Sequence, residues 1–194
     1  MPVEVGPVIL EGERLRLEPL EERHAEGLWK QAEPDLFRWM RLWWWHDSEQ
    51  EFIDLIKEIR GRKDSFAFTM IDKETGAPVG SSSYLEIRPE HRSLEIGATW
   101  IGKSHQGTRV NPEAKLLMLG HAFDQLGAIR VQLKTDSRNI QSQRAMEKLG
   151  AKRDGVLRSH IICPDGSIRD SVYYSIIENE WPAVRKGLIE RIGT

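Results

Sequence analysis

The chain has 194 residues, 39% of them hydrophobic and 30% charged, which is the composition of a soluble globular protein with one well-buried domain. A net charge of −2 argues against a broad nucleic-acid-binding surface, and no apolar run approaches the roughly 20 residues that cross a bilayer. The start of the chain lacks the pattern of a secretory signal, and the single Cys163 allows no internal disulfide, so we expect a cytoplasmic protein that contacts no membrane.

The N-terminal part predicts a strand or hairpin followed by two helices. Residues 8–20 alternate in polarity and contain a turn, and residues 21–32 form a short helix with one apolar side. Ser48 then predicts the cap of a second helix, because Glu51 follows three residues later in a capping-box pattern.

An aromatic segment lies between these two predicted helices and shows little periodicity. It contains Phe37, Trp39, Met40, Trp43, Trp44 and Trp45. The favoured interpretation is a plug of the core, because aromatic side chains dominate core burial. The functional alternative is one wall of a substrate cleft, since irregular segments on a rigid scaffold often carry binding.

The middle of the chain predicts two strands, over 65–72 and 78–88, and then a strand, a loop and a long helix over 94–127. Gly97 inside the third strand indicates a bulge or a close approach of the backbone to another group. Asn111 is the expected N-cap of the helix, with Pro112 at its first position, and Gly127 is placed to end it.

The remaining elements are a strand over 128–136, a helix over 137–150, a long hairpin and a closing helix from residue 179. Asp165-Gly166 is the strongest turn signal in the chain and marks the tip of the hairpin. The resulting order predicts an α+β domain with one mixed, largely antiparallel sheet.

The loop between Ile101 and Asn111 is a candidate anion site. A loop that leads into the start of a helix gathers unpaired backbone N–H groups at the positive end of the helix dipole. Phosphate groups are the ligands that such a site favours.

The element order and two stretches, EIGATWIGKSHQGTRVNPEA and TDSRNIQSQRAMEKLGA, resemble the GNAT superfamily of N-acetyltransferases. Within it the likeness is closest to the branch of the ribosomal-protein N-terminal acetyltransferases, and it covers nearly all of residues 1–194 as a single N-acetyltransferase domain. The resemblance implies a splayed seven-stranded sheet flanked by helices, with acetyl-CoA in the gap between the fourth and fifth strands. The phosphate loop of the family has Gln or Arg, two residues, Gly, one residue, and then Gly or Ala. Here Gln106 matches, but Arg109 and Asn111 occupy the two small positions.

The resemblance also implies the residues that bind the cofactor. In the family an Asn after the fifth strand reaches the pantetheine arm, and the matching residue is Asn139. The predicted cofactor-binding residues are Ala98, Thr99, Trp100, Ile101, Gln106, Gly107, Thr108, Arg109, Val110, Asn111, Asn139, Ser142 and Met146. Arg109 could add a charge-assisted bond to phosphate or be a solvated arginine, and Asn111 and Asn139 could each be simple helix caps.

The implied reaction is attack of a neutral amine on the acetyl thioester. Three needs follow: a base for the amine, a backbone N–H near Ala98 to Trp100 for the oxyanion, and a proton donor or polar surroundings for the leaving thiolate. Many relatives place a tyrosine at the position of Met146, so Ser142 is the predicted donor in its stead. Tyr84, Tyr173 and Tyr174 are less suited to that role. Glu95 is the predicted base, with Glu86, His46 or an ordered chain of waters as alternatives.

The expected activity is therefore direct acetyl transfer from acetyl-CoA to a primary amine, with a protein N-terminal α-amino group favoured, such as that of a ribosomal protein. A small amine such as an antibiotic, polyamine or amino acid is the alternative substrate, and a non-catalytic acyl-CoA-binding module is the alternative of another class. The six histidines lack the spacing of metal ligands, so no metal is expected. A monomer and a homodimer both remain open.

Overall fold

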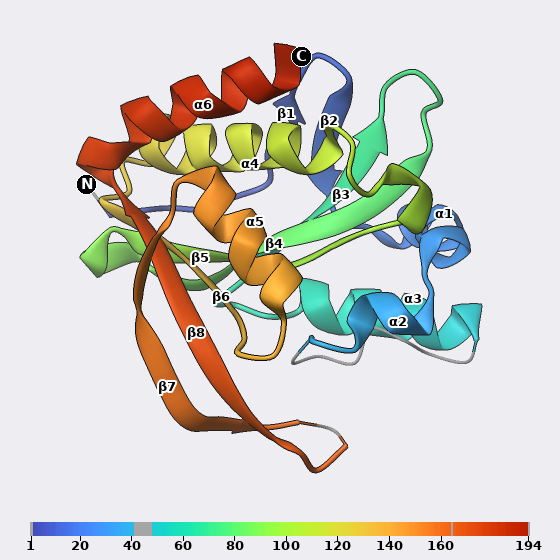
Figure 1. Cartoon of the computed structure of the whole chain (residues 1–194). Coiled ribbons are helices and arrows are strands. Elements are labelled where there is room, and N and C mark those ends of the chain that lie inside the picture. The colour runs from blue at the N-terminus through green and yellow to red at the C-terminus, as the bar shows by residue number, and fades with distance from the viewer. Residues whose placement is uncertain (1, 41–47, 164, 194) are drawn as a thin grey trace.

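A mixed sheet of eight strands forms the centre of the computed structural model, which describes residues 2–40, 48–163 and 165–193 (Figure 1). The spatial order is β1-β2-β3-β4-β5-β6-β8-β7. The strands are β1 (Leu10–Glu11), β2 (Leu15–Pro19), β3 (Phe66–Asp72), β4 (Pro78–Arg88), β5 (Ser93–Ile101), β6 (Arg130–Asp136), β7 (Lys152–Ile162) and β8 (Ile168–Ile177). The expected α+β class is confirmed. The expected count of seven strands was one too low, because the short β1 pairs with β2 to make the N-terminal segment a hairpin.

Helices cover both faces of this sheet, and each face has its own buried cluster. The helices are α1 (Ala25–Gln31), α2 (Pro34–Phe37), α3 (Glu49–Arg60), α4 (Val110–Gly120), α5 (Ile140–Leu149) and α6 (Trp181–Gly193). Figure 1 shows α4 and α6 stacked on one side and α1 to α3 gathered on the other. Leu94, Ile96 and Met118 belong to the larger cluster on the α4 side, whereas Phe37 and Trp100 belong to the cluster around α1 to α3. No described helix is long and apolar enough to cross a membrane.

Helix ends follow the sequence signals with one exception. The Ser48 side chain accepts a hydrogen bond from the backbone N–H of Glu51, and Gly150 ends α5 in a left-handed conformation at φ 97°. The prediction that Asn111 caps α4 was wrong, because Arg109 is the residue before the first helical position. The Thr108 Oγ1 atom accepts from the N–H of Val110, which starts the helix earlier and puts Asn111 in its first turn.

The strands β5 and β6 separate after a short parallel contact. Their register covers only Ser93 to Glu95 against Arg130 to Gln132, although β5 runs on to Ile101 and β6 to Asp136. Every other neighbouring pair of described strands is antiparallel. The two strands therefore diverge in the middle of the sheet.

A bulge in β5 accompanies this divergence. On β4, Ser81 lies opposite Trp100 and Ser83 lies opposite Gly97, so β5 has one residue more than β4 between these pairs. Ala98 takes up the extra length in a left-handed conformation at φ 48°. The bulge reverses the alternation of side chains, since Ile96 packs on the α4 side and Trp100 packs on the opposite side.

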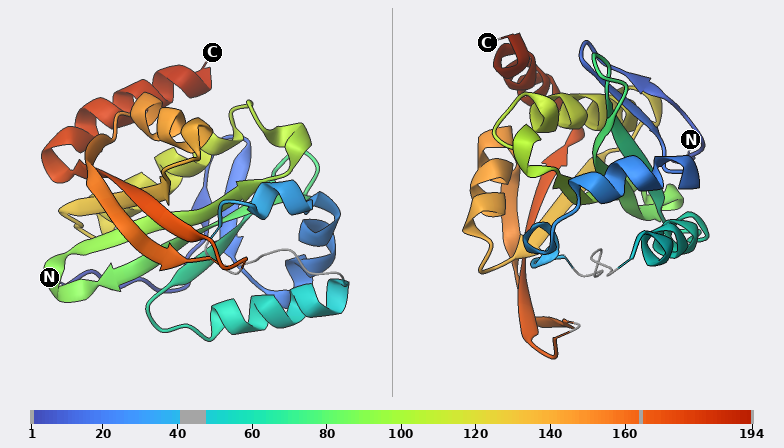
Figure 2. Two further views of the ribbon diagram at one scale, coloured as in Figure 1. Left: turned by 60° about the horizontal axis from the view of Figure 1, so that its bottom comes forward. Right: turned by 90° about the vertical axis from the view of Figure 1, so that its right-hand side faces the viewer.

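The hairpin of β7 and β8 projects beyond the rest of the sheet, as Figure 1 and the right-hand view of Figure 2 show. Its boundaries confirm the predicted hairpin, and Gly166 at its tip has φ 80°. Most of β7 is exposed, because it lies at the edge of the sheet. A second irregularity, between Leu157 and Ile161, bends the outer half.

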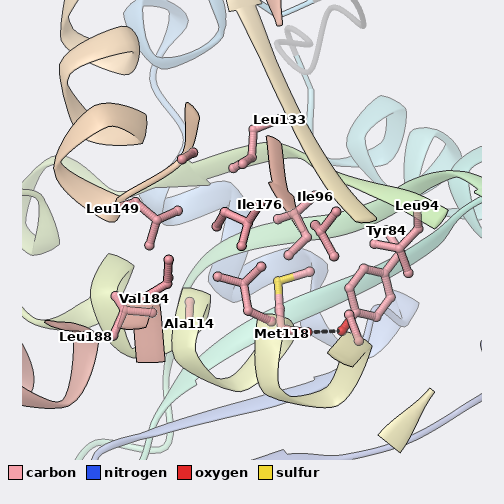
Figure 3. Close-up of a cluster of buried hydrophobic side chains, with 14 of the residues drawn as sticks. Tyr84, Leu94, Ile96, Ala114, Met118, Leu133, Leu149, Ile176, Val184 and Leu188 are labelled. Carbon is pink, nitrogen blue, oxygen red and sulfur yellow. Dashed lines mark hydrogen bonds between the residues drawn. The ribbon is translucent and has the colours of Figure 1, made fainter. Parts of the chain in front are cut away.

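Tyr84 links β4 to α4 inside the larger cluster. Its hydroxyl donates to the backbone carbonyl of Met118 at 2.7 Å, the contact drawn in Figure 3, and lies 3.1 Å from Nδ1 of His121. The ring is fully buried and packs edge-on against Phe68. Burial raises the pKa of the hydroxyl, so it stays a neutral donor at any physiological pH.

Replacing Tyr84 with phenylalanine should lower the free energy of unfolding by about 1 kcal/mol, because it removes a buried hydrogen bond to the Met118 carbonyl, which then keeps only the helix backbone donor. Urea denaturation followed by circular dichroism measures the change. Tyr174→Phe is the matched control, since its hydroxyl bonds the exposed Glu147 and should matter less. An equal or larger loss in the control would contradict this account of the α4 contact.

Candidate active site

A cavity of about 920 Å³ opens where β5 and β6 diverge. Its floor comes from residues 96–101 of β5 and 133–135 of β6. Gln106 and Gly107 in the loop, Asn111 and Lys115 on α4, and a row of α5 residues complete its walls. It extends past the α4 N-terminus at one end and to two carboxylates, Glu86 and Glu95, at the other.

The structure brings most of the predicted site residues to this cavity. The lining includes Glu95, Ala98, Thr99, Trp100, Ile101, Gln106, Gly107, Asn111, Asn139, Ser142 and Met146. Thr108, Arg109 and Val110 are not among the lining residues. The Val110 side chain is buried in the larger cluster, and Thr108 bonds within its own turn.

Arg109 is held on the far side of the helix start. Its guanidinium donates to Glu13 at 2.7 Å and to the buried Glu113 at 3.2 Å. The other oxygen of Glu113 accepts from the backbone N–H groups of Arg14 and Leu15, so this cluster ties the β1–β2 hairpin to α4. The side chain of Arg109 is thus engaged in a structural ion pair, and backbone N–H groups remain as the donors that the loop can offer to an anion.

The start of α5 is fixed by Asn139, whose Oδ1 atom accepts from the backbone N–H of Ser142 at 3.0 Å. Asn139 is therefore the cap of this helix and a lining residue of the cavity at the same time. Ser142, Ala145 and Met146 continue along the same helix face.

The end of the cavity away from the loop is charged. Lys134 Nζ lies 2.6 Å from Glu86 and 2.9 Å from Glu95, and the Gln132 amide donates to both carboxylates at 3.1 Å. Glu86 is aimed at this group by a bulge at the end of β4, where it adopts φ 47°. The four side chains come from three strands that lie side by side, β4, β5 and β6.

The two carboxylates have opposite titration behaviour. Burial raises the pKa of Glu95, which is 1% exposed, and the positive charge of Lys134 only partly offsets this effect. Glu86 is more open. Burial acts on it in the same direction, but the hydrogen bond from Lys134 keeps its pKa below the usual range. Glu95 is therefore the stronger base of the pair.

Gly97 makes room for the Glu95 carboxylate. A Cβ atom at position 97 would lie 2.7 Å from Glu95 Oε1 and 2.9 Å from the Leu85 side chain. The close approach predicted for this glycine is thus to a neighbouring carboxylate.

Different residues of the aromatic segment match the two interpretations, a plug of the core and a wall of a cleft. Phe37 is fully buried and packs edge-on against Trp100 at 5.2 Å, as a core residue does. Trp39 and Met40 line the cavity, as a cleft wall does. Trp43, Trp44, Trp45 and the alternative base His46 lie outside the described residues.

The three tyrosines differ in their distance from the site. Tyr84 and Tyr174 are buried in the larger cluster and are absent from the cavity lining. Tyr173 lies beside the charged end, with its ring 5.8 Å from Lys134 Nζ and its hydroxyl 3.5 Å from His160.

Sequence reasoning missed two lysines of the cavity, Lys115 and Lys134. Lys134 alternates with the apolar Val131 and Leu133, which marks it as a residue on the open face of a strand. Lys115 follows Asn111 by four residues and therefore lies on the same helix face. This spacing was available in the sequence, but a lysine beside an apolar stripe is read as solvent-exposed.

The sequence model of the acetyltransferase (GNAT) domain matches residues 14–152, more than half of the chain. The chain belongs to the GNAT acetyltransferase family. A GNAT protein of Bacillus licheniformis, described as an uncharacterized N-acetyltransferase p20, is 25% identical over 87% of this chain and 96% of its own length. A Bacillus subtilis protein described as a putative ribosomal N-acetyltransferase, YdaF, is 29% identical over 55% of this chain and 57% of its own.

Solved GNAT structures superpose closely on this chain. A putative acetyltransferase from T. thermophilus has a TM-score of 0.90 and 36% identity, and covers 97% of this chain and 99% of its own. Mycobacterium smegmatis RimJ, solved in complex with CoA-disulfide, has a TM-score of 0.78 at 20% identity, over 95% of this chain and 92% of its own, and shows the shared fold. As a GNAT enzyme, the protein is an acyltransferase with acetyl-CoA as co-substrate. Among residues 2–40, 48–163 and 165–193, no group of three or more His, Cys, Asp or Glu side chains is arranged to hold a metal ion.

Replacing Asn139 with alanine should cost about 1 kcal/mol of stability, because the N–H of Ser142 loses its cap. Asn139→Asp should keep the cap and the stability, since a carboxylate oxygen accepts the same hydrogen bond. Thermal unfolding of both variants measures the difference. Equal stability of the alanine and aspartate variants would show that the cap contributes nothing.

Proposed function

We propose that this GNAT enzyme transfers the acetyl group of acetyl-CoA directly to a protein N-terminal α-amino group. The observation that carries the proposal is one continuous cavity that reaches from the first turn of a helix to a buried carboxylate of raised pKa. The first end suits a diphosphate, and the second suits an amine that must lose a proton.

The residues of the cavity fit the cofactor. Backbone N–H groups of residues 106–111 would contact the diphosphate at the positive end of the α4 dipole. The divergence of β5 from β6 leaves the β5 backbone at residues 96–101 beside the cavity, where extended amide groups of the pantetheine arm would pair with it. The capping bond of Asn139 uses Oδ1, so Nδ2 is a donor for the same arm.

Glu95 is the proposed base. Its carboxylate is buried, lines the cavity and has a raised pKa, which brings its proton affinity closer to that of an amine. The left-handed bulge at Ala98, on the same strand, would present a backbone N–H to the oxyanion. Ser142, on the facing helix, would donate a proton to the leaving thiolate.

The α-amino group is favoured over lysine on chemical grounds. A free α-amino group has a pKa of about 7.7–8.0, against about 10.4 for a lysine side chain. Its ammonium form is therefore the stronger acid and loses its proton more readily to a carboxylate base. The similarity to a relative described as a ribosomal N-acetyltransferase points the same way. A ribosomal protein is therefore the first acceptor to test.

The assay incubates the protein with acetyl-CoA and a panel of free-N-terminus peptides, N-terminally blocked lysine peptides and small amines, and it follows free thiol. Turnover of the free-N-terminus peptides alone is expected. Selective turnover of polyamines, antibiotics or amino acids would replace the proposed acceptor with a small amine. Tight binding of CoA with no thiol release for any amine would replace the enzyme with a binding module.

Glu95→Gln should lower kcat/KM by about 100-fold or more while leaving the Kd for CoA unchanged. Activity of the wild type should fall as the pH drops through the raised pKa of Glu95, because the protonated acid cannot accept a proton. The residual activity of Glu95→Gln should not show this decrease at low pH. Glu86→Gln is the matched control, and a larger loss there would assign the base to Glu86.

Ser142→Ala should lower kcat more than it changes the Kd for CoA, because the hydroxyl serves the departing thiolate and not the bound cofactor. Pre-steady-state release of thiol separates this step from product release. An unchanged kcat would leave proton donation to solvent.

A further inference from the structure

Lys115 is a buried amine that the reaction described above does not use. Lys115 is 7% exposed. It lies on α4 one turn after Asn111 and lines the cavity. Its Nζ atom donates to Thr99 Oγ1 at 2.9 Å, and Thr99 Oγ1 lies 2.7 Å from Ser82 Oγ. The bulge at Ala98 makes this contact possible, since it directs Thr99 to the α4 side of the sheet.

Within the described part of the chain, no carboxylate lies within 4 Å of this amine. The other two lysines of the lining are ion-paired, Lys134 with Glu86 and Glu95, and Lys103 with Glu33. Arg169, a second buried cation of the lining, donates to the Ser171 hydroxyl and to the Trp39 backbone carbonyl. A buried ammonium that has only hydroxyl partners is costly. Burial alone accordingly lowers the pKa of Lys115 to about 7. The surroundings of Lys115 therefore lack the negative charge that would neutralise its ammonium form.

The position of Lys115 indicates where that charge would come from. Gln106, Gly107 and Asn111, at the start of α4, line the same cavity. Helical side chains lean toward the N-terminus of their helix, so Lys115 leans toward the turn that contains Asn111. Arg109, the cation of this loop that the sequence suggested for a phosphate contact, is paired with Glu13 and Glu113.

We propose that Lys115 is the cationic residue that pairs with the diphosphate of coenzyme A, and that binding of the cofactor is coupled to uptake of one proton by this amine. The inference rests on the proposed placement of the cofactor. In the free protein near neutral pH the amine is only partly protonated. A bound diphosphate would stabilise the ammonium form and raise its pKa, so above about pH 7 the cofactor would bind together with a proton.

The groups around Lys115 leave this amine as the one that takes up a proton when the cofactor binds. On β5 it donates to the Thr99 hydroxyl, which in turn bonds the Ser82 hydroxyl on β4. The α5 residues that line the cavity carry no charge, and Glu113 on α4 is bound to Arg109 and to the β1–β2 hairpin. Glu86, Glu95 and Lys134 form a closed network at the other end of the cavity. His105 also lines the cavity, and it is retained in every variant below.

The test is isothermal titration calorimetry of the full chain with CoA at pH 8, in two buffers of different ionisation enthalpy, which gives the number of protons taken up. The wild type should take up close to one proton more than Lys115→Met. The variant should bind CoA about 10- to 100-fold more weakly, because a charge-assisted contact is lost. Its affinity for 3′-phospho-ADP, which has the diphosphate but no pantetheine arm, should fall by the same factor.

Lys115→Arg separates charge from proton uptake. Arginine is always protonated, so this variant should bind CoA without taking up the extra proton. Lys103→Met removes a rim cation that is already fully protonated, and its proton uptake should match the wild type. Lys115→Met removes a buried charge and shortens the side chain by only one atom, and its circular dichroism spectrum verifies that it folds.

Three results would overturn the inference. They are equal CoA affinity in wild type and Lys115→Met, equal proton uptake in both, or a loss for CoA with none for 3′-phospho-ADP, which would assign Lys115 to the thiol arm. Failure of the wild type itself to bind CoA is a different result and would refute the proposed function instead.

Discussion

The short parallel contact between β5 and β6 is the constraint on which the rest of the site depends. Two parallel strands that stayed paired along their whole length would bury their backbone groups in each other and leave no space between them. Here the pairing ends at Glu95 and Gln132, and the bulge at Ala98 turns the remaining part of β5. The backbone N–H and C=O groups freed by this divergence are the ones that an extended, amide-containing ligand can use.

The bulge also decides which side chains reach the cavity. With unbroken alternation, Trp100 would lie on the same face as Ile96, and Thr99 would lie with Glu95. The added residue sends Trp100 to the cluster around α1 to α3 and Thr99 to Lys115 on α4. One left-handed residue thus places a hydroxyl and an amine on one side of the cavity and leaves the Glu95 carboxylate on the other.

Charge is distributed unevenly along this cavity. The Glu86, Glu95 and Lys134 group sets two carboxylates against one ammonium and keeps the Glu95 carboxylate buried at a raised pKa. Lys115 is not balanced by any described side chain, and the α4 N-terminus adds a further partial positive charge nearby. This distribution of charge supports the proposed function, in which the loop end contacts the diphosphate of the cofactor and the strand end accepts a proton from the amine.

The sequence by itself determined the local features whose causes lie within a few residues. Ser48, Asn139, Gly150 and the Asp165-Gly166 turn act through backbone hydrogen bonds or a left-handed conformation, and each is found where its pattern predicts. Periodicity and the GNAT-like motifs also indicated the α+β fold, and most of the site residues that they predicted line the cavity. The tertiary structure alone decided the pairing of Arg109 with Glu13 and Glu113, the partition of Phe37 from Trp39, and the burial of Lys115. Each of these depends on contacts between segments far apart in the chain, such as Arg109 with Glu13, and residue type and spacing carry no information about such contacts.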